Sequence, residues 1–239
     1  MKSPRNIQTV ILVAGRGTRL QPYTDTVPKP LVLVGGKPFL AHLLAFLRQQ
    51  GLRRFLLVAA YKADQVVHFA KTQSLQESPV EVVVAPEDLG TGGHLKYAEP
   101  QVDEEFFLVY GDTLFPVSYA ELYRDFAASG QDAVMSVTGK IPQGATGNVA
   151  LSHDKKIVVV YKKGDPQSSL THLDAGVLCM RRGCLQHLPP RGTISHMEEQ
   201  VFPVLAQKRT LGAHLADLEC FDIGTPERLK YYEDHFFGS

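Results

Sequence analysis

A glycine-rich turn that follows a short apolar run constrains this 239-residue chain more than any other feature. The apolar run at residues 7–13 predicts a buried first strand, and the sequence Ala-Gly-Arg-Gly-Thr-Arg follows it directly. Gly15 and Gly17 permit positive φ angles and let backbone N–H groups point into one concavity. Arg19 adds a planar guanidinium that suits phosphate oxygens, and Lys29 lies between two prolines that restrict its backbone. The stretch therefore predicts a polyphosphate site at the end of the first strand.

Two other glycine-rich phosphate loops do not fit this turn. A dinucleotide-binding turn needs a third glycine three residues after the second, where this chain has Leu20. The expected second strand ends in Ala-Ala-Tyr-Lys and not in the acidic residue that binds a ribose. The Gly-Lys-Ser/Thr of a Walker loop does not occur in the sequence.

The turn and the Pro-Lys-Pro at residues 28–30 together resemble the signature of the sugar-1-phosphate nucleotidylyltransferases, Gly-x-Gly-Thr-Arg followed by Pro-Lys-Pro. Later motifs match as well, so the resemblance covers nearly the whole chain. The Leu-Gly-Thr-Gly-Gly at residues 89–93 looks most like the mannose- and D-glycero-D-manno-heptose-1-phosphate guanylyltransferases. The resemblance implies nucleotidylyl transfer from a nucleoside triphosphate to a sugar 1-phosphate, giving a nucleotide sugar and pyrophosphate. The expected substrates are GTP and a heptose or mannose 1-phosphate.

The charge balance argues against nucleic acid or an anionic membrane as a partner, because Lys+Arg and Asp+Glu both number 25. The first apolar run is too short for a signal peptide or a membrane span, so a cytoplasmic enzyme is expected. Three cysteines without C-x-x-C spacing indicate reduced thiols. A homodimer is expected only from the resemblance.

Alternating strand and helix patterns predict an α/β fold, a Rossmann-like, doubly wound and mostly parallel sheet with a small sugar-binding β extension. One domain is expected over residues 1–239. Its nucleotide-binding half spans about 1–140 and its sugar-phosphate-binding half about 141–239, with no appended β-helix domain. The expected strands are 7–13, 31–34, 55–60, 80–84, 106–110, 133–138, 148–151, 156–161 and 173–180, and the expected helices 38–50, 63–71, 94–98, 118–129, 198–207 and 226–237.

Two aspartates distant in sequence are candidate metal ligands. Asp112 ends a buried strand, where an acidic residue is unfavourable unless it meets a cation or donors. Asp222 precedes the last helix in Asp-Ile-Gly-Thr-Pro. Two such carboxylates would make a hard oxygen site suited to Mg²⁺. In the resembled family, the aspartates of these two motifs hold the metal.

The resemblance also assigns residues to the nucleotide. Those expected at the catalytic centre are Arg19, Lys29, Asp112 and Asp222. Those expected to bind the nucleotide are Leu12, Val13, Ala14, Gly15, Gly17, Thr18, Arg19, Lys29, Glu87, Gly90, Thr91 and Asp112. Glu87 could read a base or ribose edge.

The acceptor residues implied by the resemblance are Gly147, Lys162, Lys163, Asp174 and Asp222. Lys163 matches the family lysine that holds the sugar phosphate. Lys162 stands where the family has a glutamate, and Asp174 where it has an asparagine. A lysine donates hydrogen bonds and cannot accept them. A pairing of Lys162 with Asp174 is a hypothesis for how the two departures compensate.

Two alternatives stay open from the sequence. The same chemistry could use UTP, dTTP or CTP, with another sugar phosphate or phosphocholine as acceptor. A different class of protein, an inactive regulatory subunit that binds nucleotide sugars, is less favoured because Arg19, Lys29, Asp112 and Asp222 are all present.

Overall fold

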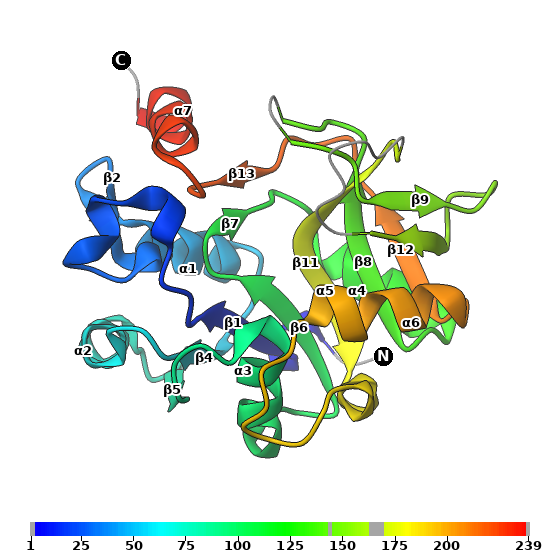
Figure 1. Ribbon diagram of the computed structural model, residues 1–239, viewed down its shortest axis with the longest axis horizontal. Coiled ribbons are helices and arrows are strands. Elements are labelled where there is room, and N and C mark those ends of the chain that lie inside the picture. Colours follow the sequence, from blue (N-terminus) through cyan, green and yellow to red (C-terminus); the bar gives the residue numbers. More distant parts are fainter. Residues whose placement is uncertain (1–2, 143–144, 163–169, 238–239) are drawn as a thin grey trace.

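The computed structural model describes residues 3–142, 145–162 and 170–237. Its centre is a seven-stranded sheet with the order β12-β8-β11-β6-β1-β4-β5 (Figure 1). All neighbouring strands are parallel except that β11 is antiparallel to β6 and β8, so the predicted mostly parallel sheet is confirmed. The strands are β1 (Gln8–Val13), β4 (Arg54–Ala59), β5 (Val80–Val84), β6 (Glu105–Tyr110), β8 (Ala133–Thr138), β11 (Leu173–Arg181) and β12 (Leu211–Leu215).

Helices cover both faces of this sheet. Alternate side chains of a strand point to opposite faces, so Ile11 of β1 belongs to one buried apolar cluster and Val10 to the other. Phe39 of α1 packs in the first cluster and Phe202 of α6 in the second. The helices are α1 (Phe39–Gln49), α2 (Ala63–Gln73), α3 (Gly90–Ala98), α4 (Tyr119–Ser129), α5 (Met197–Gln200), α6 (Phe202–Gln207) and α7 (Pro226–Phe237).

Three helix boundaries follow the local signals in the sequence. The Ser118 hydroxyl accepts a hydrogen bond from the Glu121 N–H at 3.3 Å and caps α4, a role for which serine is favoured. Gly130 then ends α4 with a φ of 68°, and Gly51 follows α1 with a φ of 87°. These caps fix where the chain returns to the sheet.

Several elements differ from expectation, among them α3, the helix expected over 198–207 and β12. α3 begins at Gly90 and not at residue 94, because the glycines themselves form its first turn. The helix expected over 198–207 is two short helices, separated at Val201, whose φ is −106°. β12 was not predicted, and it joins the sheet beside β8.

Small sheets complete the fold. β9 (Val149–Leu151) pairs with β10 (Val158–Tyr161), and β2 (Leu33–Val34) pairs with β3 (Lys37–Pro38). The third pair joins β7 (Thr113–Leu114) to β13 (Phe221–Asp222), which leads into α7 (Figure 1). No helix among the described residues is both long and apolar enough to cross a membrane.

Candidate active site

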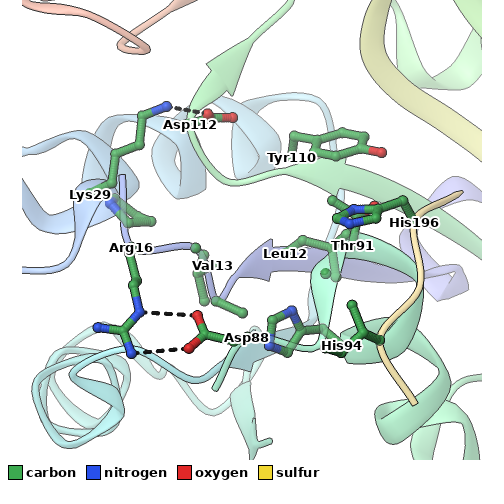
Figure 2. Close-up of a pocket in the computed structure, with 15 residues that line it drawn as sticks. Leu12, Val13, Arg16, Lys29, Asp88, Thr91, His94, Tyr110, Asp112 and His196 are labelled. Atoms are coloured by element: carbon green, nitrogen blue, oxygen red, sulfur yellow. Dashed lines mark hydrogen bonds and ion pairs between the residues drawn. The ribbon is translucent and has the colours of Figure 1, made fainter. Parts of the chain in front are cut away.

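Two pockets open beside the ends of β1 and β6. The first has a volume of about 450 Å³ and lies between the turn after β1 and the start of α3 (Figure 2). The second has about 340 Å³ and lies between β11, the end of β10 and the start of α7. Tyr110 and Asp112 line both pockets. A molecule in one pocket would therefore meet a molecule in the other at the end of β6.

Most residues predicted to bind the nucleotide line the first pocket. They are Leu12, Val13, Ala14, Gly15, Lys29, Gly90, Thr91 and Asp112. Arg19 lines the second pocket instead, although its neighbours belong to the same turn. Gly17, Thr18 and Glu87 line neither pocket.

Gly17 lies where the turn after β1 packs closely against the Pro-Lys-Pro segment. Its φ is 67°, and a Cβ atom added there would lie 2.9 Å from the Lys29 Cβ. The Thr24 hydroxyl donates to the Gly17 carbonyl at 3.0 Å. The missing side chain thus lets the Pro-Lys-Pro segment pack directly against the turn, with Lys29 facing the pocket.

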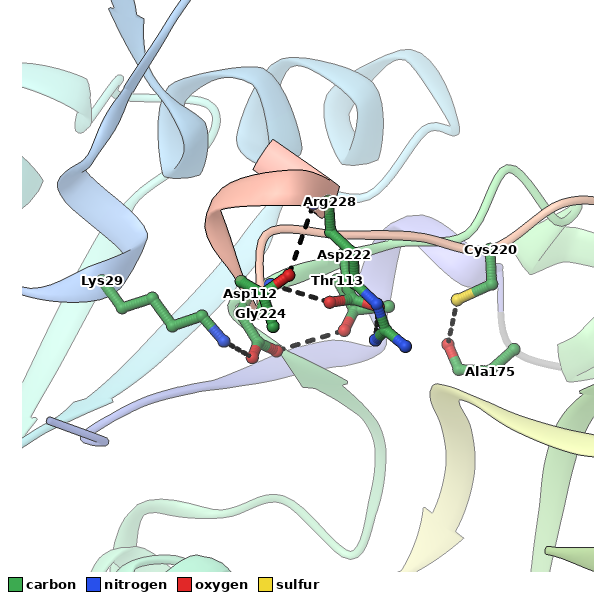
Figure 3. A network of polar contacts seen from close by, with 9 residues as sticks. Lys29, Asp112, Thr113, Ala175, Cys220, Asp222, Gly224 and Arg228 are labelled. Carbon is green, nitrogen blue, oxygen red and sulfur yellow. Dashed lines mark hydrogen bonds and ion pairs between the residues drawn. The ribbon is translucent and has the colours of Figure 1, made fainter. Parts of the chain in front are cut away.

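Lys29 and Asp112 form a close ion pair at the junction of the pockets (Figures 2 and 3). The Lys29 Nζ lies 2.5 Å from the Asp112 Oδ2, and the two side chains are 10% and 33% exposed. Burial raises the pKa of the Asp112 carboxyl. The charge of Lys29, together with hydrogen bonds from Lys29 and Thr113, outweighs this and leaves that pKa below its usual value.

This ion pair predicts an acid-dependent part of the stability. An aspartate in an unfolded chain titrates near about pH 3.9. Because the folded pKa of Asp112 is lower, its contribution is present above about pH 4 and is lost as the pH falls through the folded pKa. Urea unfolding at a series of pH values should show a stability difference between wild type and Asp112→Asn that shrinks on acidification. A difference that stays constant down to pH 2 would contradict this assignment.

Asp222 lies on the strand beside Asp112. Register pairs Asp222 with Thr113, and the Ile223 N–H donates to the Asp112 carbonyl at 3.1 Å. The Asp222 Oδ1 accepts from the Gly224 N–H at 2.7 Å, and Oδ2 accepts from Arg228 at 2.6 Å (Figure 3). The two predicted metal ligands are therefore brought to one place by the β7–β13 pair.

The donor set at this place decides which metal could bind. Among the described residues, no three or more His, Cys, Asp or Glu side chains form a metal-binding cluster. Two carboxylates alone do not enclose an ion, but magnesium is usually held by one or two carboxylates together with substrate phosphates. Asp112 and Asp222 fit that pattern.

The second glycine-rich stretch is held by a segment from the other half of the chain. The Ser195 carbonyl accepts from the Gly92 and Gly93 N–H groups at 2.9 and 3.1 Å. A Cβ atom on Gly93 would lie 2.5 Å from the Thr193 carbonyl oxygen. The glycines are therefore needed for close backbone packing, and these two N–H groups face protein.

The same segment carries residues into the first pocket that the sequence did not single out. Ile194, 66% exposed, and His196 line this pocket opposite the turn after β1. His94 of α3 lines it too and is buried; burial lowers the pKa of its imidazole. Sequence patterns could not assign Ile194 and His196, because only the contact of residues 193–196 with α3 brings them to the pocket.

An ion-pair cluster borders the first pocket. Arg16 lies 2.5 Å from the Glu87 Oε2 and 3.0 Å from the Asp88 Oδ1. Asp88 lines the pocket and has a φ of 60° (Figure 2). Glu87 is thus next to the pocket but engaged by Arg16, so its role toward a base stays a prediction.

Asp174 is fixed within the second pocket. Its Oδ2 accepts from the Tyr161 hydroxyl at 3.1 Å, and its Oδ1 accepts from the Gly176 N–H at 2.9 Å. Its own N–H donates to the Asn148 Oδ1 at 2.8 Å. All four residues line the pocket, which gives its wall both hydrogen-bond donors and acceptors.

The other predicted acceptor residues are placed differently. Gly147 packs against the backbone, since a Cβ atom there would lie 1.9 Å from the Leu170 carbonyl oxygen. The Lys162 side chain is exposed and does not line the pocket. The pairing of Lys162 with Asp174 stays a hypothesis. Lys163 lies outside the described residues.

The sequence matches a known protein family over nearly its whole length. A family model described as "Nucleotidyl transferase" matches residues 8–232, which include both pockets. The chain belongs to this family. The family membership that the glycine-rich turn and the Pro-Lys-Pro segment predicted is therefore confirmed.

Curated relatives of this nucleotidyl transferase carry related names. The mannose-1-phosphate guanyltransferase of Aspergillus oryzae is 31% identical over 231 residues, which cover 92% of this chain and 62% of the relative. The mannose-1-phosphate guanylyltransferase of Mycobacterium tuberculosis is 28% identical over 234 residues, with the same coverage. The chain thus spans about three fifths of the length of the curated relatives it matches.

Solved structures share the fold. HddC from Yersinia pseudotuberculosis, complexed with GMP-PN, superposes with a TM-score of 0.75 at 27% identity, over 96% of this chain and 99% of that chain. A UTP-bound UGPase from Acinetobacter baumannii gives a TM-score of 0.76 at 19% identity, over 96% of this chain and 93% of that one. The second likeness supports the fold alone.

One buried carboxylate links the two pockets of this nucleotidyl transferase. Glu198 is 6% exposed and lines the second pocket. It accepts hydrogen bonds from the Thr91 hydroxyl at 2.6 Å and from the Tyr110 hydroxyl at 2.7 Å. Burial and the Glu198 charge hold the pKa of Tyr110 far above its usual value, so the Tyr110 hydroxyl keeps its proton and stays a donor. The sequence marked residue 198 only as a helix start.

Glu198→Gln should lower the free energy of unfolding, because an amide replaces a charged acceptor of two buried hydrogen bonds. The expected loss is about 1–3 kcal/mol, measured by urea denaturation. Glu199→Gln is the matched control, since Glu199 is the next residue of α5 and is exposed. Equal stability of the two variants would rule out a structural role for the Glu198 network.

Proposed function

We propose that this chain transfers the guanylyl group of GTP to a mannose or heptose 1-phosphate, with release of pyrophosphate. The observation that carries the proposal is the junction of two pockets at Asp112, where Lys29 and Asp222 also lie. Two anionic substrates that meet there would find cations and a two-carboxylate metal site. The names of the curated relatives and the GMP-PN bound to HddC support guanine as the base.

The proposed reaction is a single in-line displacement. An oxygen of the acceptor phosphate forms a bond to the α-phosphorus of the triphosphate, and the bond from that phosphorus to the bridging β-phosphate oxygen breaks. The electron pair leaves with pyrophosphate, so no covalent enzyme intermediate is needed. Catalysis then consists of positioning and charge stabilisation, which the enzyme supplies through fixed groups.

Each pocket has a proposed part in this reaction. In the first pocket, the turn after β1 supplies backbone donors at Gly15, and Lys29 neutralises charge on the triphosphate. Arg19 lies at the second pocket and would contact the acceptor phosphate or the α-phosphate between the two. Asp174 and Glu198 would accept hydrogen bonds from sugar hydroxyls.

Asp112 and Asp222 would hold a magnesium ion. When bound, the ion would supply positive charge for phosphate oxygens of both substrates. Lys29 and Arg228, which now neutralise these carboxylates, would have to share them with the ion.

The proposal is tested by pyrophosphate release with magnesium across a grid of substrates. One axis is GTP, UTP, dTTP, CTP and ATP, and the other is mannose, heptose, glucose and N-acetylglucosamine 1-phosphates with phosphocholine. Turnover confined to GTP with mannose or heptose 1-phosphate is the expected result. Turnover with another combination of nucleoside triphosphate and acceptor would support nucleotidylyl transfer but would contradict the proposed substrates. Nucleotide binding with no turnover in any cell would support an inactive binding subunit.

One observation favours the alternative in which the same chemistry uses another base or acceptor. Lys162 is exposed and does not replace the hydroxyl acceptor that the family carries at this position. The acceptors of the second pocket come from Asp174 and Glu198 instead, so the preferred sugar need not be that of the relatives.

A further inference from the structure

An arginine that no sequence motif marks lines the second pocket. Arg228 lies in the first turn of α7, and its side chain is 31% exposed. One guanidinium nitrogen donates to the Asp222 Oδ2 at 2.6 Å (Figure 3). The carboxylate proposed to hold a metal is therefore already neutralised by an arginine of its own chain.

A second guanidinium reaches the same place. Arg19 lines this pocket, and among the described residues no carboxylate pairs with it. A Cβ atom built on Gly224 would lie 2.6 Å from the Asp222 Oδ1 and 3.8 Å from a terminal nitrogen of Arg19. Arg19 and Arg228 thus approach Asp222 from the turn after β1 and from α7, which makes this end of the pocket rich in planar donors.

Helix stability does not explain Arg228. A cation in the first turn of a helix lies against the positive end of the helix dipole, which is unfavourable. The ion pair with Asp222 is part-buried, and the desolvation of its two charges offsets much of their attraction. Asp222 also has other support, because the Gly224 N–H donates to it and β13 pairs with β7. An arginine that stands at the unfavourable end of a helix dipole and lines a pocket is better explained by a ligand.

We propose that Arg228 binds the phosphate of the acceptor together with Arg19, and that it leaves Asp222 when it does so. This inference rests on the proposed function, because it assigns the acceptor phosphate to the cationic end of the second pocket. A phosphate monoester offers three oxygens, enough for both guanidiniums. Once Arg228 turns to the phosphate, Asp222 has an oxygen available for the cation that it shares with Asp112.

The exchange has a thermodynamic consequence. If phosphate removes Arg228 from Asp222, phosphate and a divalent cation must each strengthen binding of the other, because coupling between two sites is reciprocal. Without Arg228, the Asp222 carboxylate would be available to the cation even when no phosphate is bound. The part of the coupling that comes from Arg228 would then disappear.

The test uses equilibrium binding of Mn²⁺, followed by electron paramagnetic resonance, and of inorganic phosphate, followed by calorimetry. Wild type should bind Mn²⁺ more tightly when phosphate is present. Arg228→Met should bind phosphate about 10- to 100-fold more weakly, the effect of one charged hydrogen-bonding group. It should also bind Mn²⁺ alone more tightly than wild type. Arg228→Lys should recover part of the phosphate affinity.

Arg124→Met is the matched control, since Arg124 also pairs with a carboxylate on a helix but lines neither pocket. It should behave as wild type in both titrations. Phosphate affinity that is unchanged in Arg228→Met, or no phosphate binding by wild type, would overturn the proposal. These two titrations need no turnover. If no substrate combination is turned over but phosphate and Mn²⁺ still strengthen each other's binding, the proposed reaction is rejected and the proposal for Arg228 stands.

Discussion

Asp112→Asn should lower kcat by about 100-fold or more while the chain keeps its fold, because removal of a group that stabilises transition-state charge has effects of this size. Asp112 and Tyr110 are the side chains that line both pockets among the residues that the structure describes. The substitution removes one negative charge from the proposed metal site. Asparagine still offers an oxygen to Lys29, so the contact across the junction is weakened but not lost.

The measurement is steady-state pyrophosphate release at saturating GTP, sugar 1-phosphate and magnesium. Asp103→Asn is the control, because Asp103 also pairs with a cation, Arg54, but lies outside both pockets. The control should keep wild-type turnover. Normal turnover in Asp112→Asn would show that the metal assignment is wrong.

The fold was largely predictable because its signals are local. Continuous apolar runs marked β1, β4 and β6, and Ser118 and Gly130 marked the ends of α4. The pairing of Asp112 with Asp222 was expected from motif identity, and the β7–β13 pair supplies its physical cause. Two-residue strands have no periodicity to detect, so the sequence could not show that pair by itself.

The parts of the site that were not predicted depend on contacts between distant segments. Glu198 reaches Thr91 only because residues 193–196 pack on the first turn of α3. Arg228 faces Asp222 only because α7 starts beside β13. In the sequence, both residues belong to ordinary polar helix faces, whose pattern indicates exposure. Lys162 is the opposite case, since its motif position predicts a sugar-phosphate-binding residue while its side chain is exposed and does not line the second pocket.

Gly90→Ala should be far more damaging than Gly15→Ala or Gly183→Ala, because two physical effects coincide at Gly90. Its φ of 72° is unfavourable for a residue with a side chain, and the added Cβ would lie 2.4 Å from the Ser195 carbonyl oxygen. Backbone cannot move aside as a flexible side chain can. The expected loss in free energy of unfolding is about 2–4 kcal/mol, the sum of backbone strain and overpacking.

The same substitution should weaken nucleotide binding, since the displaced segment carries Ile194 and His196 in the wall of the first pocket. Urea unfolding and nucleotide titration of three variants separate the two effects. Gly183→Ala has open space around its Cβ and lines neither pocket, so it should change neither quantity. Gly15→Ala also has open space but faces the pocket, so it should lose nucleotide affinity with little loss of stability. If Gly90→Ala were as stable as Gly183→Ala, residues 193–196 would not be held against α3 as described, and the link between the two halves of the site would have to be abandoned.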